Sequence, residues 1–413
     1  MMNYDSVISQ NLGKDFAYVA RQCARSKYSL PIEEGKKCAT LGILKIGANI
    51  TFQPTVTRTA ANFDVLSVCR ALNENFRLHF VTAKTRNTLI PKDCAFTDVE
   101  DACNRINDLG IDALLVFNGN VNNWGGEPNH STFAIWKCIR HFKGRIFYLH
   151  TDGAMRLHQI YDETFVKRGW DKRWPFSDIY IDRDDIVYLT QARSRRRIKD
   201  LTTGNGIIPI KEENIFYFPI QEAILLRAPK LPKERKITWD LIYGGSYRNG
   251  KRRDEMVKWY FGNENFSTLM FGSIALDKFK GVNLTEPYPN FEGPIQNAEF
   301  TAKLSTGLAT VHIVDPWYED HWVSLRFYES LIAGVIPFVD WQADKRKKLY
   351  FPDSPLTDFL YVRKKKDLID RLTLIKKEDC ADEVLDLCKD SVRCRWNKQG
   401  YKDLLKDTIQ KRL

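Results

Sequence analysis

The sequence lacks the features that mark membrane, secreted and zinc-bound proteins. It contains no run of about 18 apolar residues, so we expect no membrane span. Its first residues show no basic region followed by an apolar stretch, so we expect no signal peptide. It has nine cysteines in 413 residues, and none forms a Cys-X-X-Cys pair. This count argues against a disulfide framework or a structural zinc site and favours a reducing compartment.

What the chain does have is an excess of positive charge. Lys and Arg number 63 against 52 Asp and Glu, which gives a formal net charge of +11. Such an excess favours a polyanionic partner, namely nucleic acid, a nucleotide or an anionic membrane surface. Hydrophobic residues at 43% and charged residues at 28% are typical of a folded globular protein. At roughly 150 residues per domain, the length predicts two or three domains.

Short apolar runs alternate with helical patterns along the chain, which predicts β-α-β units around parallel sheets. A basic stretch with two prolines, residues 227–236, divides the pattern and predicts an interdomain linker. Ligands of open α/β sheets bind beyond the carboxyl ends of the strands, so we expect the site in the loops that follow them. The predicted strands are residues 39–47, 78–82, 113–118, 145–151, 186–189 and 214–220, then 239–244, 267–271, 308–314, 335–339 and 359–362.

The loop after the first strand of the second half has the clearest anion-binding pattern. Residues 243–253 are Tyr-Gly-Gly-Ser-Tyr-Arg-Asn-Gly-Lys-Arg-Arg. The glycines permit a close backbone approach, and Arg248 and Arg252 lie four residues apart at a predicted helix start, which suits a diphosphate. No Gly-X-Gly-X-X-Gly is present, so a dinucleotide fingerprint is not indicated. A solvated basic turn explains the segment equally well.

Residues 315–329 follow an apolar strand and enter a predicted helix. Arg326 and Glu329 share one helix face. Glu329 could accept the hydroxyls of a ribose while Arg326 pairs with a phosphate. An intrahelical ion pair explains both residues without a ligand and is the favoured interpretation of this segment alone.

Two loops of the first half carry weaker signals. Asp152 follows a predicted strand and is placed either as a general base or as a helix N-cap. The Asn- and Gly-rich loop 118–129 holds Trp124, which suits insertion into a base stack or local packing. Basic clusters at 193–197, 345–348 and 363–366 are either solvated faces or contacts to a phosphate backbone.

Together these segments resemble the DNA beta-glucosyltransferases of T-even bacteriophages. The resemblance rests on four segments and covers about residues 38–413. It implies an α/β fold of the GT-B class, in which two Rossmann-like domains face each other across a deep cleft and a C-terminal helix crosses back to the first domain. We expect an N-terminal extension at 1–37, an acceptor domain at 38–226 completed by helix 390–413, and a UDP-sugar domain at 227–389. The four segments are residues 118–129, 147–152, 239–252 and 315–329.

The resemblance implies an enzyme that moves glucose from UDP-glucose to 5-hydroxymethylcytosine in duplex DNA, with inversion and with base flipping. By position, Asp152 resembles the catalytic base, and Asp315 is a weak candidate ligand for Mg²⁺ or Mn²⁺. The expected DNA contacts are Asn122, Trp124, Arg195 and Arg196. The expected UDP-sugar contacts are Val56, Gly245, Ser246, Arg248, Arg252, Ile295, Tyr318, Arg326 and Glu329.

The sequence departs from the family at the sugar-binding acid. Residues 55–63 contain no carboxylate where the family has a Glu, the nearest being Asp64, and Gln221 stands at a second acidic position of the family. The donor could therefore be another UDP-sugar such as UDP-arabinose, and the acceptor could be hydroxymethyluracil or an already glycosylated base. A GT-B transferase with a non-DNA acceptor and a non-catalytic DNA-binding protein are the remaining alternatives. We expect a monomer without a membrane partner, acting in the cytoplasm of an infected bacterium.

Overall fold

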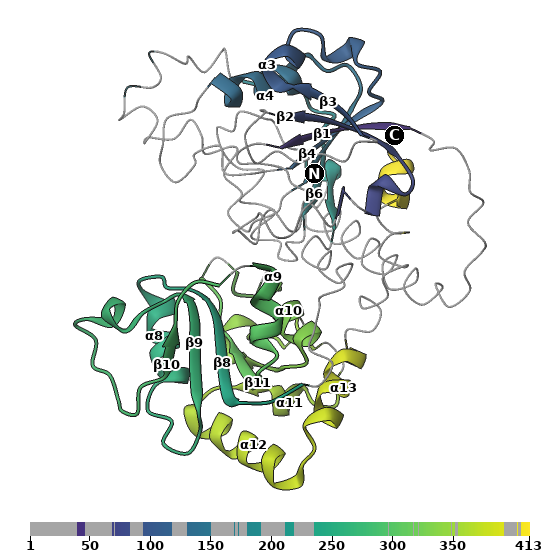
Figure 1. Cartoon of the computed structure of the whole chain (residues 1–413). Coiled ribbons are helices and arrows are strands. Elements are labelled where there is room, and N and C mark those ends of the chain that lie inside the picture. Colours follow the sequence, from purple (N-terminus) through teal and green to yellow (C-terminus); the bar gives the residue numbers. More distant parts are fainter. Residues whose placement is uncertain are drawn as a thin grey trace, which may run out of the picture. The chain divides into compact units, whose positions relative to one another are not determined.

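In the computed structural model the chain divides into two compact units, each built around one parallel sheet (Figure 1). Unit 1 is Met1–Leu226 with Asn397–Leu413, and unit 2 is Arg227–Trp396. The structure describes residues 39–45, 68–69, 71–82, 94–117, 130–149, 169, 172, 180–190, 211–218, 235–295, 297–316, 318–320, 322–347, 349–351, 354–391, 403 and 406–413. The expected N-terminal extension, residues 1–37, lies outside this range.

Unit 1 contains a seven-stranded sheet in the order β3-β2-β1-β4-β5-β6-β7, and every neighbouring pair is parallel. The predicted β-α-β alternation is confirmed here. The strands are β1 (Thr40–Lys45), β2 (Arg77–Thr82), β3 (Ala95–Asp98), β4 (Ala113–Phe117), β5 (Arg145–Leu149), β6 (Val187–Thr190) and β7 (Ile215–Tyr217). The helices are α3 (Val99–Ala102), η1 (Ile106–Asp108), α4 (His130–His141) and η3 (Glu212–Asn214).

Strand β4 of unit 1 is apolar and buried along its whole length because both faces of the sheet are covered. Alternate residues of β4 enter different cores: Leu114 and Val116 pack with α3 and α4, whereas Leu115 and Phe117 pack on the opposite face. Ile409, near the end of the chain, joins the second core and is 1% exposed. The last residues of the chain therefore complete the hydrophobic core of unit 1.

Unit 2 contains a six-stranded parallel sheet in the order β10-β9-β8-β11-β12-β13. The strands are β8 (Trp239–Ser246), β9 (Thr268–Ser273), β10 (Asn290–Glu292), β11 (Gly307–His312), β12 (Ile336–Asp340) and β13 (Tyr361–Val362). The longer helices are α8 (Lys251–Tyr260), α9 (Asn297–Leu304), α10 (Leu325–Ala333), α12 (Lys365–Glu378) and α13 (Ala381–Ser391). Shorter helical turns are η5 (Leu276–Phe279), η6 (Trp341–Ala343) and α11 (Thr357–Leu360). None of the described helices in either unit is long and apolar enough to cross a membrane.

Three strand predictions differ from the structure, all at sheet edges. β3 and β10 were not predicted, since each has only three or four residues and most of these are exposed or half-buried. The predicted strand 359–362 is wrong in its first half, because Phe359 and Leu360 belong to α11 and only Tyr361–Val362 pairs with β12. Edge strands lack the continuous burial that produces a long apolar run.

The order of the second sheet defines a switch point between β8 and β11. From β8 the chain first builds β9 and β10 on one side and then crosses to β11 on the other. Ligands of open α/β sheets bind at such a point, beyond the carboxyl ends of the two strands. In unit 2 these ends are Ser246 and His312.

The carboxyl ends of β8 and β9 approach each other unusually closely. Gly245 is paired with Gly272, whose φ is +115°, a value that favours glycine. A Cβ at Gly272 would lie 2.0 Å from the carbonyl oxygen of Gly245. Gly245 and Gly272, which have no side chains, thus allow the backbone that leads into the loop after β8 to take this position.

We predict that Gly272→Ala destabilises unit 2 by about 3 kcal/mol, since it combines a disfavoured backbone conformation with a backbone clash. Urea denaturation followed by tryptophan fluorescence measures the loss. Gly281→Ala is the matched control, because its φ is +77° but a Cβ there would meet no described atom within 4 Å. Equal losses in the two variants would show that the clash contributes nothing.

Candidate functional site

The candidate site lies where β8 and β11 end, in unit 2. After β8 the chain makes a short turn, and α8 begins at Lys251, directly after Gly250 with φ +76°. The first N–H groups of a helix have no partner within the helix and carry a partial positive charge. The segment that the sequence singled out for anion binding is therefore a strand, a tight turn and a helix N-terminus.

Arg248 and Arg252 converge on a single carboxylate oxygen. Nη1 of Arg248 donates to Oδ2 of Asp315 at 2.7 Å, and Nη1 of Arg252 donates to the same oxygen at 3.2 Å. Arg248 is in the turn and Arg252 in the first turn of α8, whereas Asp315 follows β11. The two arginines that the sequence placed on one side of a helix start thus meet at one point.

Arg252 is the more deeply held of the two arginines. Its side chain is 14% exposed against 51% for Arg248. Nη2 donates to the Tyr243 hydroxyl at 2.8 Å, while Nε has no acceptor among the described residues. Burial by itself would lower the pKa of Arg252, but Tyr243 and Asp315 outweigh it and raise the pKa above its usual value. Arg252 therefore stays positively charged, and its Nε–H group is a donor that no described residue uses.

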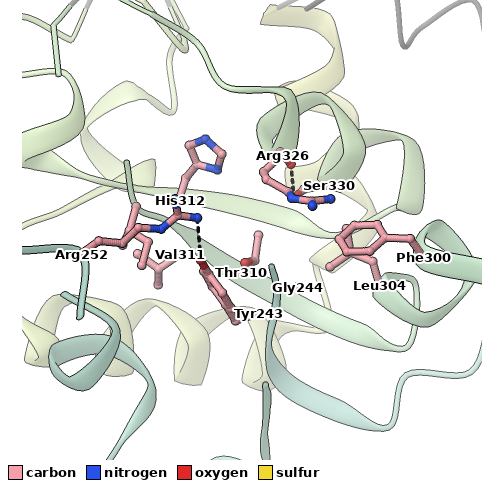
Figure 2. Close-up of a pocket in the computed structure, with 11 residues that line it drawn as sticks. Tyr243, Gly244, Arg252, Phe300, Leu304, Thr310, Val311, His312, Arg326 and Ser330 are labelled. Carbon is pink, nitrogen blue, oxygen red and sulfur yellow. Dashed lines mark hydrogen bonds between the residues drawn. The ribbon is translucent and has the colours of Figure 1, made fainter. Parts of the chain in front are cut away.

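A pocket opens beside these residues (Figure 2). One wall is apolar, formed by Phe300 and Leu304 of α9. The guanidinium of Arg326, on α10, lies 4.0 Å from the centre of the Phe300 ring, and Arg252 lines the pocket as well. The complete lining is Tyr243, Gly244, Arg252, Phe300, Leu304, Thr310, Val311, His312, Ile313, Arg326 and Ser330.

Arg326 and Glu329 form the intrahelical pair that the spacing allowed. Nη1 of Arg326 donates to Oε2 of Glu329, which is 5% exposed. The Ser330 hydroxyl donates to the carbonyl of Arg326 at 2.8 Å and fixes the backbone of this turn. The ion pair and the pocket are compatible, since the same guanidinium pairs with Glu329 and faces Phe300.

His312 is a site residue that the sequence interpretation missed. It ends β11, is 3% exposed, and its Nε2 lies 2.8 Å from the hydroxyl of Ser324, the residue before α10. Burial, followed by the charges of Arg252 and Arg326, lowers the pKa of His312 to about 3. The imidazole is therefore neutral between two arginines and links β11 to the start of α10. The only sequence signal was a lone histidine at a strand end.

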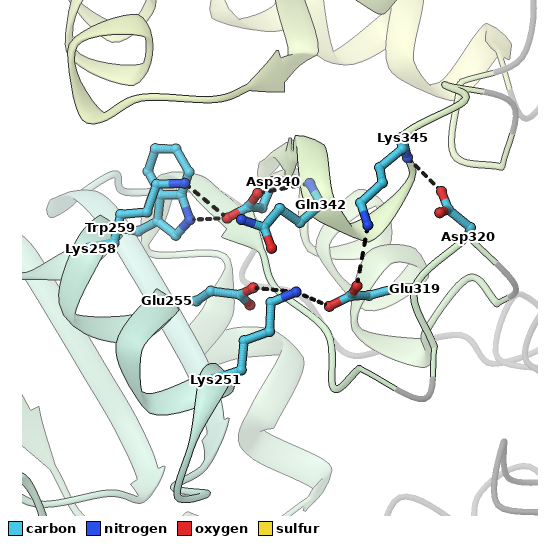
Figure 3. Close-up of polar contacts among 9 residues, drawn as sticks. All are labelled: Lys251, Glu255, Lys258, Trp259, Glu319, Asp320, Asp340, Gln342 and Lys345. Atoms are coloured by element: carbon cyan, nitrogen blue, oxygen red, sulfur yellow. Dashed lines mark hydrogen bonds and ion pairs between the residues drawn. The ribbon is translucent and has the colours of Figure 1, made fainter.

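A second polar cluster ties the loop of Asp315 to α8 (Figure 3). Lys251 donates to Glu319 and also lies 4.0 Å from Glu255, while Lys345 lies 3.9 Å from Glu319. The backbone N–H of Lys345 donates to Asp320 at 2.6 Å. Burial first and the neighbouring Asp340 next raise the pKa of Glu255 to about 8. Lys251 and Lys345 thus hold the loop through Glu319.

The remaining predicted residues divide into two groups. Gly245 and Ser246 end β8, Ile295 packs against the core that contains Phe300, and the Tyr318 ring lies 6.0 Å from that of Trp322. These positions agree with the expected contacts to a nucleotide, which the structure does not contain. The others lie outside the described residues: Val56, Asn122, Trp124, Asp152, Arg195 and Arg196.

The described residues offer no protein-built metal site. Among them, no group of three His, Cys, Asp or Glu side chains is placed to hold a metal ion. Oδ2 of Asp315, the weak candidate ligand, already accepts from two guanidiniums. Asp182 and Asp184, two aspartates separated by one residue, precede β6. The carboxylate of Asp184 accepts a hydrogen bond from the Lys211 ammonium group.

Comparisons with known proteins agree with this architecture over nearly the whole chain. The DNA beta-glucosyltransferase of Enterobacteria phage T4 is 27% identical over 385 residues, which cover 89% of this chain and 99% of that protein. The resemblance found in the sequence is confirmed. No protein-family model matches the chain.

Solved structures show the same fold. The T4 phage enzyme in complex with UDP-glucose has a TM-score of 0.66 at 23% identity, and its complex with UDP and Mn²⁺ has a TM-score of 0.68 at 24% identity. Each comparison covers 90% of this chain and 99% of the other. An alpha-glucosyltransferase in complex with UDP-glucose and DNA containing an abasic site has a TM-score of 0.58 at 12% identity, covering 91% and 99%. The GT-B fold class is therefore confirmed.

We predict that His312 makes the protein less stable in acid. Its pKa is about 3 in the folded chain and about 6.5 when unfolded, so its contribution to stability is present above pH 6.5 and is lost as the pH falls. Between pH 7.5 and 5.0 this loss amounts to about 2 kcal/mol. Urea denaturation of wild type and His312→Gln should show their stability difference shift by that amount. If the stability difference between wild type and His312→Gln does not change with pH, then the pKa of His312 is the same in the folded and unfolded protein.

Proposed function

We propose that this protein transfers glucose from UDP-glucose to the hydroxymethyl group of 5-hydroxymethylcytosine in duplex DNA, with inversion at the anomeric carbon. The observation that carries the proposal is the convergence of Arg248 and Arg252 at the N-terminus of α8, beside a pocket at the sheet's switch point. The T4 protein that aligns along almost its full length is a DNA beta-glucosyltransferase, and solved complexes of the T4 enzyme hold UDP-glucose.

In this proposal the UDP-sugar binds to unit 2. The diphosphate binds at the N-terminus of α8 and to Arg248, Arg252 and Arg326. Glu329 accepts hydrogen bonds from the ribose hydroxyls. Negative charge grows on the diphosphate as its bond to the sugar breaks, so fixed guanidiniums stabilise the transition state more than the ground state. The remaining contacts to the nucleotide sugar come from Val56, Gly245, Ser246, Ile295 and Tyr318.

The acceptor hydroxyl needs a base, because a hydroxymethyl group is a poor nucleophile while it keeps its proton. Asp152, which follows β5 in the sequence, takes that proton as the oxygen attacks the anomeric carbon. The bond from this carbon to the diphosphate oxygen breaks in the same step, and the electron pair leaves with UDP. The sugar passes through an oxocarbenium-like state, and attack from the opposite face inverts the centre.

DNA binding is assigned to residues of unit 1. Asn122 and Trp124 would fill the space that the flipped base leaves in the stack, and Arg195 and Arg196 would contact phosphates. A net charge of +11 supports a polyanionic acceptor over a small neutral one. The absence of an acid at residues 55–63 keeps a pentose donor such as UDP-arabinose as the second candidate.

A panel of UDP-sugars tests the reaction directly. The protein is incubated with each donor and either hydroxymethylated or unmodified duplex DNA, and the nucleosides released by digestion are weighed by mass spectrometry. We expect a hexose adduct with UDP-glucose on hydroxymethylated DNA alone. A pentose adduct would replace glucose by arabinose in the proposal. No adduct with any donor would refute transfer to DNA.

We predict that Asp152→Ala lowers transfer by at least about a hundredfold and leaves UDP binding within about twofold of wild type, because the base acts on the acceptor. Single-turnover assays and calorimetric titration with UDP measure the two effects. Asp152→Asn, which keeps the size of the side chain, should show the same separation. Parallel loss of binding and transfer in both variants would assign Asp152 a structural role.

A further inference from the structure

Asp315 occupies the point at which the two diphosphate-binding arginines converge. Its Oδ2 lies 2.7 Å from Nη1 of Arg248 and 3.2 Å from Nη1 of Arg252. Its side chain is 10% exposed, so neither water nor salt screens this contact fully. A ligand oxygen bound by the Nη1 groups of both arginines would require the position that the carboxylate oxygen now fills.

The backbone of the loop that carries Asp315 is held from several sides. The Tyr318 N–H donates to the carbonyl of Asp315 at 2.8 Å, which closes a turn. Glu319 is bound by Lys251 of α8, and the Asp320 N–H donates to the carbonyl of Ala343 at 2.9 Å. A bound diphosphate would therefore remain close to the negative charge of Asp315.

We propose that Asp315 is a resident counter-anion that competes with the diphosphate for Arg248 and Arg252 and thereby speeds the release of UDP. This inference rests on the proposed function and concerns the control of the same site. In the empty site the carboxylate keeps two like charges together. In the occupied site it repels the phosphates, which weakens UDP binding and shortens the life of the product complex.

A purely supporting role for Asp315 predicts the opposite result. If the carboxylate only orients the arginines, then its removal lets them separate and UDP binds more weakly. If it competes with the ligand, then its removal leaves both guanidiniums to the phosphates and UDP binds more tightly. Asp315→Asn distinguishes the two roles, because it removes the charge and keeps the size and one acceptor oxygen.

The experiment measures the affinity for UDP by titration calorimetry and the release rate by stopped-flow displacement, in metal-free buffer. For Asp315→Asn we expect about tenfold tighter UDP binding, a similar fall in the release rate, and an unchanged affinity for uridine, which has no phosphate. Asp315→Ser should change in the same direction, so the result does not depend on one variant folding well.

Asp254→Asn is the matched control for charge. Asp254 lies on α8 together with Arg252, is 61% exposed and pairs with Arg253 at 2.8 Å. Its UDP affinity should stay within about twofold of wild type. Unchanged or weaker UDP binding in both Asp315 variants would overturn the counter-anion role and leave the proposed function intact. A wild-type protein that binds neither UDP nor UDP-glucose would instead contradict the proposed function itself.

Discussion

Two guanidinium groups that point at the same small volume repel each other, and a negative charge placed there offsets the repulsion. In this protein Asp315 supplies that charge for Arg248 and Arg252, and much of unit 2 is arranged around the contact. The arginines come from the segment after β8, and the aspartate comes from the loop after β11. These segments are far apart in the sequence, and they meet because β8 and β11 are neighbouring strands that run in the same direction.

The groups next to the arginines have to be neutral or acidic, and the structure shows how each one meets this requirement. His312 lies among positive charges and is buried, so its proton is lost at any pH near neutrality. The Tyr243 hydroxyl accepts from Arg252 and adds no competing cation. Elsewhere on α8, burial and neighbouring carboxylates raise the pKa of Glu255 to about 8, which limits its negative charge. The electrostatics of the pocket therefore depend on neutral groups as well as on the arginines.

The sequence predicted the central strands and the turn before α8 well, for a physical reason. A strand such as β4 is buried on both faces, so each of its residues has to be apolar and the run is visible without a structure. The glycines and arginines at 244–252 are likewise visible, because a tight turn before a helix needs local residue types. Edge strands such as β3 escaped because partial burial imposes no such pattern.

The partners of the site could not be predicted in the same way. Nothing local shows that Asp315 holds Arg248, since 67 residues separate them in the sequence and only the sheet order brings them together. The role of His312 depends on burial and on two distant cations, and neither is visible in the sequence near it. Residue types therefore indicated which ligand chemistry to expect, whereas the topology decided which charges oppose one another.

The basic clusters of unit 2 also contain carboxylates that pair with their lysines. In these clusters Lys345 is near Glu319, Lys347 pairs with Asp358 and Lys366 pairs with Asp370. Exposed pairs of this kind contribute little to stability, so a phosphate can displace the carboxylate at small cost. Each displaced carboxylate nevertheless stays nearby and offsets part of the lysine's charge. If these clusters contact the DNA of the proposed function, the number of phosphates that each one neutralises is therefore smaller than a count of its lysines and arginines suggests, and the salt dependence of binding is correspondingly weaker.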